Sequence, residues 1–178
     1  MFRDFSANEI APVAEELDHE ETLPLSILER GARQGFLGAT VPEKYAGVGL
    51  DFMSYCLLVE ALARDCMSIA VTLGTHLSMV ATTILSHGSE VQRTEFLPAL
   101  ASGESLGAFA MTEPDAGSDT TTLQTSALLD GNHYVVEGVK TWVANGEIAS
   151  LFLVFAEACG GKLALLIPVG TPGLSVGY

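Results

Sequence analysis

The 178-residue sequence predicts an α+β protein, in which an amino-terminal all-α helical bundle is followed by a partial antiparallel β-sheet or barrel. Up to Gly103, apolar residues recur at helical spacing, and no strand signal intervenes between the helices. After Ser105 the helical period disappears, and short apolar segments separated by turn residues follow. We therefore expect two domains, residues 1–104 and residues 105–178, the second of them incomplete.

Capping residues and helix breakers delimit the helices of the first region. The apolar residues between Phe2 and Leu17 predict an amphipathic helix that is bent near Pro12. The later boundary signals are Pro24 at a first turn, Gly35 after a last turn, Asp51 as an N-cap, and Ser89 with Gln92 as a capping box. The last of these helices is expected to end in the segment PALASGE, residues 98–104.

One segment is long and apolar enough to require a membrane check. Residues 66–89 carry no Asp, Glu, Lys or Arg. However, Leu73, Leu77, Val80 and Ile84 fall on one helical stripe, and small polar residues occupy the opposite face. This pattern favours a buried helix in a soluble protein, and we predict no membrane span.

Turn signals divide the second region into strands. Asp130-Gly131 predicts a hairpin between LQTSALL and HYVVEG, and Glu137-Gly138 predicts a second tight bend before VKTWVANG. The segments LFLVFA (151–156) and LALLIPV (163–169) read as two further strands separated by a glycine pair.

Composition narrows the class of ligand and the compartment. The net charge of −14 disfavours a nucleic-acid surface, because such a chain repels phosphate at long range. The three cysteines have no metal-ligand spacing and predict reduced thiols. No secretory signal is evident, so we expect a cytoplasmic protein, or one of the mitochondrial matrix if the source is eukaryotic.

Two motifs carry candidate chemistry. In AFAMTEPDAGSD (108–119) an apolar strand leads into a tight turn with small side chains and exposed N–H groups, which allows close approach of a flat or anionic ligand. In GVKTWVANG (138–146) a strand would place Lys140, Trp142 and Ala144 on one face, where the indole could stack on a planar ring. Taken alone, each motif favours the ordinary alternative, a strand-to-loop exit for the first and core packing of Trp142 for the second.

Together with FLGATVPEKYAGVGL and FLPALASGE, these motifs resemble the acyl-CoA dehydrogenase family in order and spacing along essentially the whole chain. The resemblance implies an amino-terminal helical domain, a flavin-binding middle β-domain, and a carboxy-terminal helical bundle that this chain lacks. It implies FAD-dependent α,β-dehydrogenation of an acyl-CoA thioester, with short or medium straight chains favoured by likeness to butyryl-type members. Electron-transferring flavoprotein would be the electron acceptor. The expected assembly is a homo-oligomer, or a hetero-oligomer with a carboxy-terminal half.

The resemblance also assigns site residues. The expected flavin-binding residues are Phe109, Ala110, Met111, Thr112, Gly117, Ser118, Trp142, Val143 and Ala144. Ser118 is also expected to touch the CoA part of the substrate. The family commonly has a threonine where this chain has Ala144, so a hydroxyl near the flavin N5 atom is missing.

No catalytic residue is assigned within the chain, because the family's glutamate base lies in the carboxy-terminal bundle. Glu113, Glu147 and His76 are the candidate substitutes, and a structural or solvated role is favoured for each of them. No metal site is expected. The alternative function is a non-catalytic flavin-binding, CoA-binding or assembly subunit, and a weaker one is a remnant reading frame.

Overall fold

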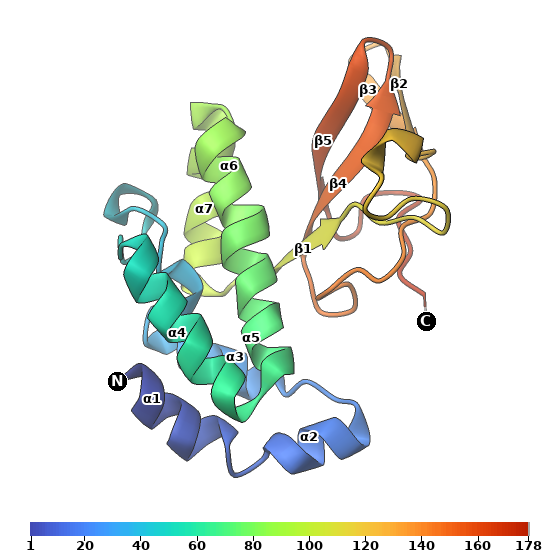
Figure 1. The fold of residues 1–178 in the computed structure, drawn as a ribbon. Coiled ribbons are helices and arrows are strands. Elements are labelled where there is room, and N and C mark those ends of the chain that lie inside the picture. The colour runs from blue at the N-terminus through green and yellow to red at the C-terminus, as the bar shows by residue number, and fades with distance from the viewer. Residues whose placement is uncertain (178) are drawn as a thin grey trace. The chain divides into compact units, whose positions relative to one another are not determined.

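A computed structural model describes residues 1–177, which divide into two compact units, Met1–Leu106 and the segment from Gly107 onward. The first is helical and the second contains a sheet, as the fold class predicted (Figure 1). The helices are α1 (Phe2–Phe5), α2 (Ala14–Glu20), α3 (Leu25–Arg33), α4 (Phe52–Asp65), α5 (Met67–Gly74), α6 (Thr82–His87) and α7 (Glu90–Ser102). The strands are β1 (Gly107–Ala110), β2 (Ser126–Asp130), β3 (His133–Glu137), β4 (Leu151–Ala158) and β5 (Gly161–Pro168).

The predicted helix boundaries are confirmed where a capping side chain defines them. The Asp51 carboxylate accepts a hydrogen bond of 2.7 Å from the Ser54 N–H at the start of α4. At α7, Ser89 and Gln92 form a reciprocal capping box, and the helix ends before Gly103, whose φ is 79°. The predicted bend near Pro12 is present as a turn over residues 11–13, where α1 and the π-helical segment that continues it (Ser6–Ile10) end before α2 begins.

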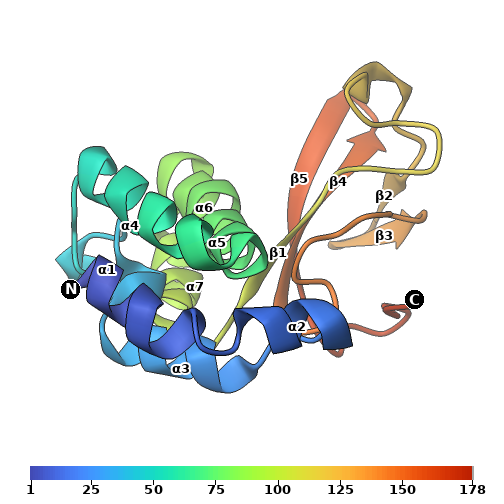
Figure 2. The same ribbon diagram turned by 60° about the horizontal axis from the view of Figure 1, so that its bottom comes forward.

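The helical unit is built around one long helix, which runs through α5, a π-helical segment (Thr75–Ala81) and α6, as Figure 2 shows in green. Its inward side chains are fully buried, Leu77 and Val80 being 0% exposed. They pack in one core with Leu58, Leu97 and Leu100 from the neighbouring helices, and all three are likewise 0% exposed. The stripe predicted from Leu73 to Ile84 is therefore the core face of this helix.

The same stretch, Met67–His87, is long and apolar enough to cross a membrane by length and composition. A core helix of a soluble protein passes the same test, and 56% of its most apolar window is buried inside the protein. Leu77, Val80 and Ile84 of this stretch are buried inside the helical unit.

His76 lies on this helix and is 0% exposed. Its Nε2 atom is 3.1 Å from the carbonyl oxygens of both Leu37 and Leu100, so Nε2 carries the proton and donates to them. Burial lowers the pKa of His76 to about 4, although both carbonyl contacts act in the opposite direction. The side chain is therefore a neutral link between the long helix, α7 and the loop after α3.

A pH dependence of stability follows from this burial. Below the ordinary pKa of 6.5 the unfolded chain takes up a proton that folded His76 does not, so the free energy of unfolding falls as the pH drops from 6.5 to about 4. The slope should approach about 1.4 kcal/mol per pH unit. Urea unfolding followed by far-UV circular dichroism measures it, with His76→Gln as the non-titrating control. Equal slopes in the two proteins would contradict the assignment.

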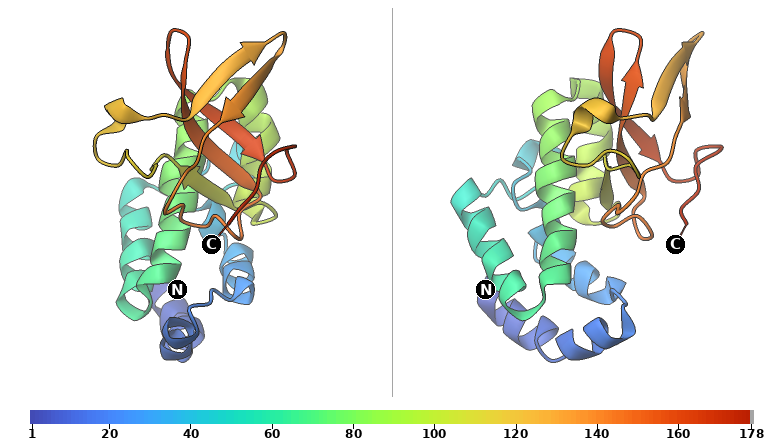
Figure 3. Two further views of the ribbon diagram at one scale, coloured as in Figure 1. Left: turned by 90° about the vertical axis from the view of Figure 1, so that its right-hand side faces the viewer. Right: turned by 45° about the vertical axis from the view of Figure 1, so that its right-hand side comes forward.

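The sheet has the strand order β1-β4-β2-β3, with β5 also paired to β4. The β2–β3 hairpin predicted at Asp130-Gly131 and the β4–β5 hairpin at the glycine pair are both present, and they separate toward their tips in Figure 3. The expectation of a purely antiparallel sheet was wrong, because β4 pairs in parallel with β1 along Gly107–Ala110 and with the start of β2. These pairings join strands that are distant in sequence, which turn signals do not register.

The predicted strand over residues 138–146 does not form. Trp142 and Asn145 have positive φ values of 55° and 67°, which no extended strand accommodates. The segment is a looped excursion between β3 and β4. Lys140 and Trp142 therefore do not share a face, since the Lys140 side chain is 9% exposed whereas Trp142 is 92% exposed.

Candidate functional site

The segment after β1 forms a tight turn held by its own backbone. Glu113 N–H donates to the Ala116 carbonyl at 2.8 Å, and Ala116 N–H donates back to Glu113 at 3.2 Å. Pro114 and Asp115, at the tip of this turn, are exposed. Gly117 and Ser118 follow the turn and are exposed, and within residues 1–177 no hydrogen bond reaches the N–H of either. The turn thus presents two free backbone donors beside small side chains.

The carboxylate of Glu113 points inward, away from this turn, and the residue is 5% exposed. It accepts hydrogen bonds from the backbone N–H groups of Gln124 at 2.6 Å and Thr125 at 2.9 Å. Lys140 Nζ lies 2.7 Å from the same carboxylate. Burial acts to raise the pKa of Glu113, but the donors from Lys140, Thr125 and Gln124 outweigh it and hold the pKa at about 2.

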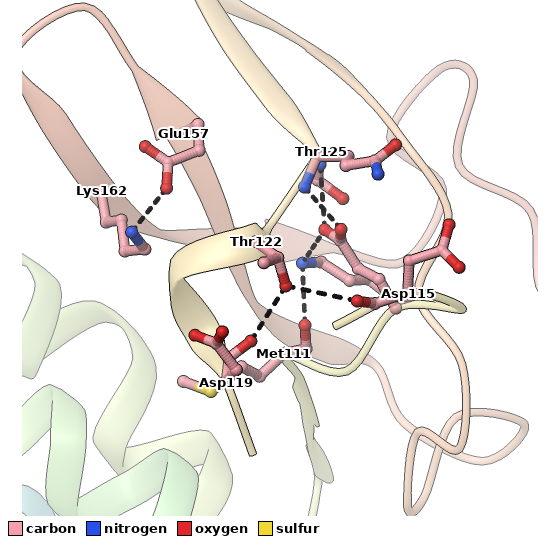
Figure 4. A network of polar contacts seen from close by, with 10 residues as sticks. Met111, Asp115, Asp119, Thr122, Thr125, Glu157 and Lys162 are labelled. Carbon is pink, nitrogen blue, oxygen red and sulfur yellow. Dashed lines mark hydrogen bonds and ion pairs between the residues drawn. The ribbon is translucent and has the colours of Figure 1, made fainter. Parts of the chain in front are cut away.

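Lys140 joins the loop before β4 to the segment after β1. Its Nζ also donates to the Met111 carbonyl at 3.0 Å, and Thr141 N–H donates to the Thr112 carbonyl at 2.8 Å. Figure 4 shows this network around Met111 and Thr125. Two predicted site segments, one containing Met111 and Thr112 and the other containing Trp142, are therefore brought side by side.

Trp142 extends from this junction into solvent. Its left-handed backbone costs about 1 kcal/mol relative to an ordinary conformation. Its neighbour Val143 packs against the core cluster that contains Ala110, Ala149 and Phe152. A strained residue whose own side chain is exposed while the next side chain is anchored in the core is typical of a ligand-facing loop rather than of core packing.

The other predicted site residues belong to the same two segments, but their side chains differ in exposure. The Ala110 side chain is 3% exposed and faces the core, so only its backbone can contact a ligand. Phe109 is partly exposed and packs on Phe155 with ring centroids 5.1 Å apart. Ala144 is partly exposed within a turn closed by the hydrogen bond from Gly146 N–H to the Val143 carbonyl, 3.0 Å.

Two contacts of the site were not predicted from the sequence, the Glu113–Lys140 ion pair and the contact that anchors Asn145. The Asn145 side chain donates to the Gly107 carbonyl at 3.0 Å and so fixes the far end of the Trp142 loop. One signal was available. Lys140 and Lys162 are the only lysine or arginine residues after Gly107, and no other charged residue lies within residues 138–146 around Lys140. A lone cation in such a segment indicates a buried partner.

Comparisons with known proteins agree across the chain. Residues 1–104 match the family profile described as acyl-CoA dehydrogenase, N-terminal domain, and residues 108–178 match the corresponding middle domain. The short-chain specific acyl-CoA dehydrogenase of Clostridium acetobutylicum is 38% identical over 182 residues, which cover 99% of this chain and 48% of that protein. The chain thus spans about half the length of the curated relatives it matches.

Solved structures give the same result. Butyryl-CoA dehydrogenase from Megasphaera elsdenii superposes with a TM-score of 0.92 at 35% identity, covering 97% of this chain and 47% of that one. An acyl-CoA dehydrogenase of Bacillus anthracis, solved in complex with FAD, superposes with a TM-score of 0.92 at 37% identity, covering 99% of this chain and 31% of that one. With both domain profiles matched and the fold shared, this chain belongs to the acyl-CoA dehydrogenase family.

Proposed function

We propose that this chain supplies the flavin- and substrate-facing part of an enzyme that oxidises the Cα–Cβ bond of a short- or medium-chain acyl-CoA thioester. The observation that carries the proposal is the position of Trp142, which is 92% exposed on a strained loop and is hydrogen-bonded through Thr141 to the segment of the TEP-x-AGSD motif. Family membership and the FAD complex of the Bacillus anthracis relative support it.

The residues present fit FAD. A flat isoalloxazine ring needs an apolar face, which Trp142 provides, and hydrogen-bond donors along its edge, which the N–H groups of Gly117 and Ser118 provide. Thr112 and Ser118 would add hydroxyls, that of Ser118 toward the CoA part of the substrate. Both lysines of this unit are already ion-paired, so backbone donors must supply the contacts to phosphate.

FAD held by these residues would supply the acceptor for a hydride from the β-carbon, and electron-transferring flavoprotein would be the acceptor of its electrons. The residues of this chain hold the ring plane, keep water from its face and orient the thioester. Ala144 offers no hydroxyl at the position where the family commonly has threonine, so flavin reactivity depends on backbone donors of the same loop.

Two ionisable groups of the chain are unsuited to act as the base that removes the α-proton. A general base needs a pKa near the working pH and access to the substrate. Glu113 has a pKa of about 2 and directs its carboxylate at three protein donors. His76 has a pKa of about 4 and is fully buried. Glu147, the third candidate, is exposed in the turn that precedes β4. The family resemblance, and not the exclusion of every carboxylate of this chain, leads us to assign the base to a carboxy-terminal domain supplied on the same or another chain.

Flavin binding to the purified chain tests the proposal. FAD should bind, and Trp142→Ala should weaken binding by about tenfold, because stacking on the ring is lost. Trp142→Phe should retain most of the affinity. Equilibrium dialysis with flavin absorbance measures both. Since Trp142 is 92% exposed, Trp142→Ala should change the free energy of unfolding by less than about 0.5 kcal/mol. Unaltered affinity in Trp142→Ala would exclude the stacking role.

A second experiment tests the reaction. The chain is combined with the carboxy-terminal half of a short-chain relative, and acyl-CoA-dependent dye reduction is assayed with butyryl-CoA and longer straight chains. Turnover that requires both halves supports a dehydrogenase segment. Bound FAD without turnover in any combination would instead favour the non-catalytic subunit.

A further inference from the structure

The ion pair between Lys140 and Glu113 is buried to an unusual degree. Its N–O distance is 2.7 Å, and the two side chains are 9% and 4% exposed. The only other ion pair in this unit among the described residues, Lys162–Glu157, is 41% and 38% exposed. Burying two charges requires desolvation that the attraction between them scarcely offsets, so a buried pair is poor evidence of a role in stability alone.

The geometry of the pair indicates another role, because both partners also hydrogen-bond to backbone groups. Lys140 Nζ contacts the Met111 carbonyl, and the Glu113 carboxylate accepts from the N–H groups of Gln124 and Thr125. The pair therefore joins three backbone segments, at residues 111–113, 124–125 and 140–141. None of these segments belongs to a strand of the sheet. Charge-assisted hydrogen bonds take the place of regular strand pairing there.

Both flavin-facing elements begin at this junction. Trp142 lies two residues after Lys140, and the turn that leads to Gly117 and Ser118 starts at Glu113. The exposed indole has no core packing of its own, so its direction depends on how the preceding residues are held. An apolar pair of equal size could fill the space but could not satisfy the Met111 carbonyl and the N–H groups of residues 124 and 125.

We propose that Lys140 and Glu113 are positioning residues, which hold the Trp142 loop and the TEP-x-AGSD turn in the arrangement that binds the flavin ring before it arrives. This inference rests on the proposed function for the identity of the ligand, but not for the preset arrangement itself. Preorganisation of this kind raises affinity by removing the cost of ordering the loops on binding.

Trp142 is the only tryptophan, so its fluorescence anisotropy reports directly on the loop in the flavin-free chain. Lys140→Met removes the charge and keeps the aliphatic stem, whereas Lys140→Arg keeps the charge. Lys162→Met removes the exposed ion pair and is the matched control. We expect lower anisotropy and about tenfold weaker FAD binding in Lys140→Met, and values near wild type in Lys140→Arg and Lys162→Met.

The two hypotheses fail separately. If the wild-type chain does not bind FAD, the proposed function fails, and the anisotropy comparison alone decides the positioning role. If the wild-type chain binds FAD while Lys140→Met matches it in affinity and anisotropy, the positioning role is overturned. Should Lys140→Met not fold, as judged by circular dichroism, Glu113→Gln replaces it, because the amide keeps the shape of the carboxylate and loses its charge. For Glu113→Gln we expect the results given above for Lys140→Met, and affinity and anisotropy equal to wild type would again overturn the positioning role.

Discussion

Replacing Gly47 by alanine is expected to destabilise the helical unit by about 3 kcal/mol. A Cβ atom at this position would overlap the carbonyl group of Val41, which is backbone and cannot rotate away. The loop must then open. That would break the hydrogen bonds from Val48 N–H to the Gly38 carbonyl and from Gly49 N–H to the Val41 carbonyl, both 2.9 Å.

Gly74→Ala is the matched control in the same unit. Gly74 lies in helix α5, and the nearest atom to an added Cβ is the Tyr55 hydroxyl at 3.6 Å, an ordinary contact. Alanine in a helix interior is favoured over glycine by about 0.5–1 kcal/mol, so this variant should be slightly more stable than wild type. Urea unfolding followed by far-UV circular dichroism measures both variants. A Gly47→Ala protein as stable as Gly74→Ala would refute the steric argument.

Gly47 also illustrates which parts of the fold were predictable. The stretch FLGATVPEKYAGVGL was recognised as irregular and rich in glycine, but the sequence does not show which glycine is required for space. The required position depends on the carbonyl of Val41. Gly47 lies against this carbonyl because the chain folds back through the 3-10 turns Phe36–Gly38 and Glu43–Tyr45, on either side of Val41. Helix starts such as Asp51 and Ser89 were predicted correctly, because an N-cap side chain and the backbone N–H that donates to it lie within three residues of each other.

The error at residues 138–146 has the opposite origin. Alternation of Lys140, Trp142 and Ala144 suits a strand, and nothing local argues against it. The decisive interaction is with Glu113, which is 27 residues away and draws the lysine inward. Once Lys140 is fixed, the left-handed backbone at Trp142 turns the indole outward. The motif residues were thus identified by family resemblance, while the direction of their side chains required the tertiary structure.

Breaking the Lys140–Glu113 ion pair is expected to have the second large effect on stability, in the sheet-containing unit. Lys140→Met should destabilise this unit by about 3–5 kcal/mol, because it leaves the Glu113 carboxylate buried without its cation. The double variant Glu113→Gln with Lys140→Met should recover part of this loss, since no buried charge then remains. Trp142 fluorescence anisotropy during urea unfolding is a suitable measure, because the only tryptophan lies in this unit and its loop is held in place only while the unit is folded.

Acid titration separates this charge effect from simple loss of packing. In the wild type the pKa of Glu113 is about 2 rather than 4.5, so its stabilising contribution is complete above pH 4.5 and is lost as the pH falls toward 2. Without Lys140 its largest favourable side-chain partner is gone and burial raises its pKa, so the carboxyl should protonate nearer neutral pH. The deficit of Lys140→Met relative to wild type should accordingly shrink in mild acid. A deficit that is constant with pH would mean that the lysine stem, and not its charge, stabilises the junction.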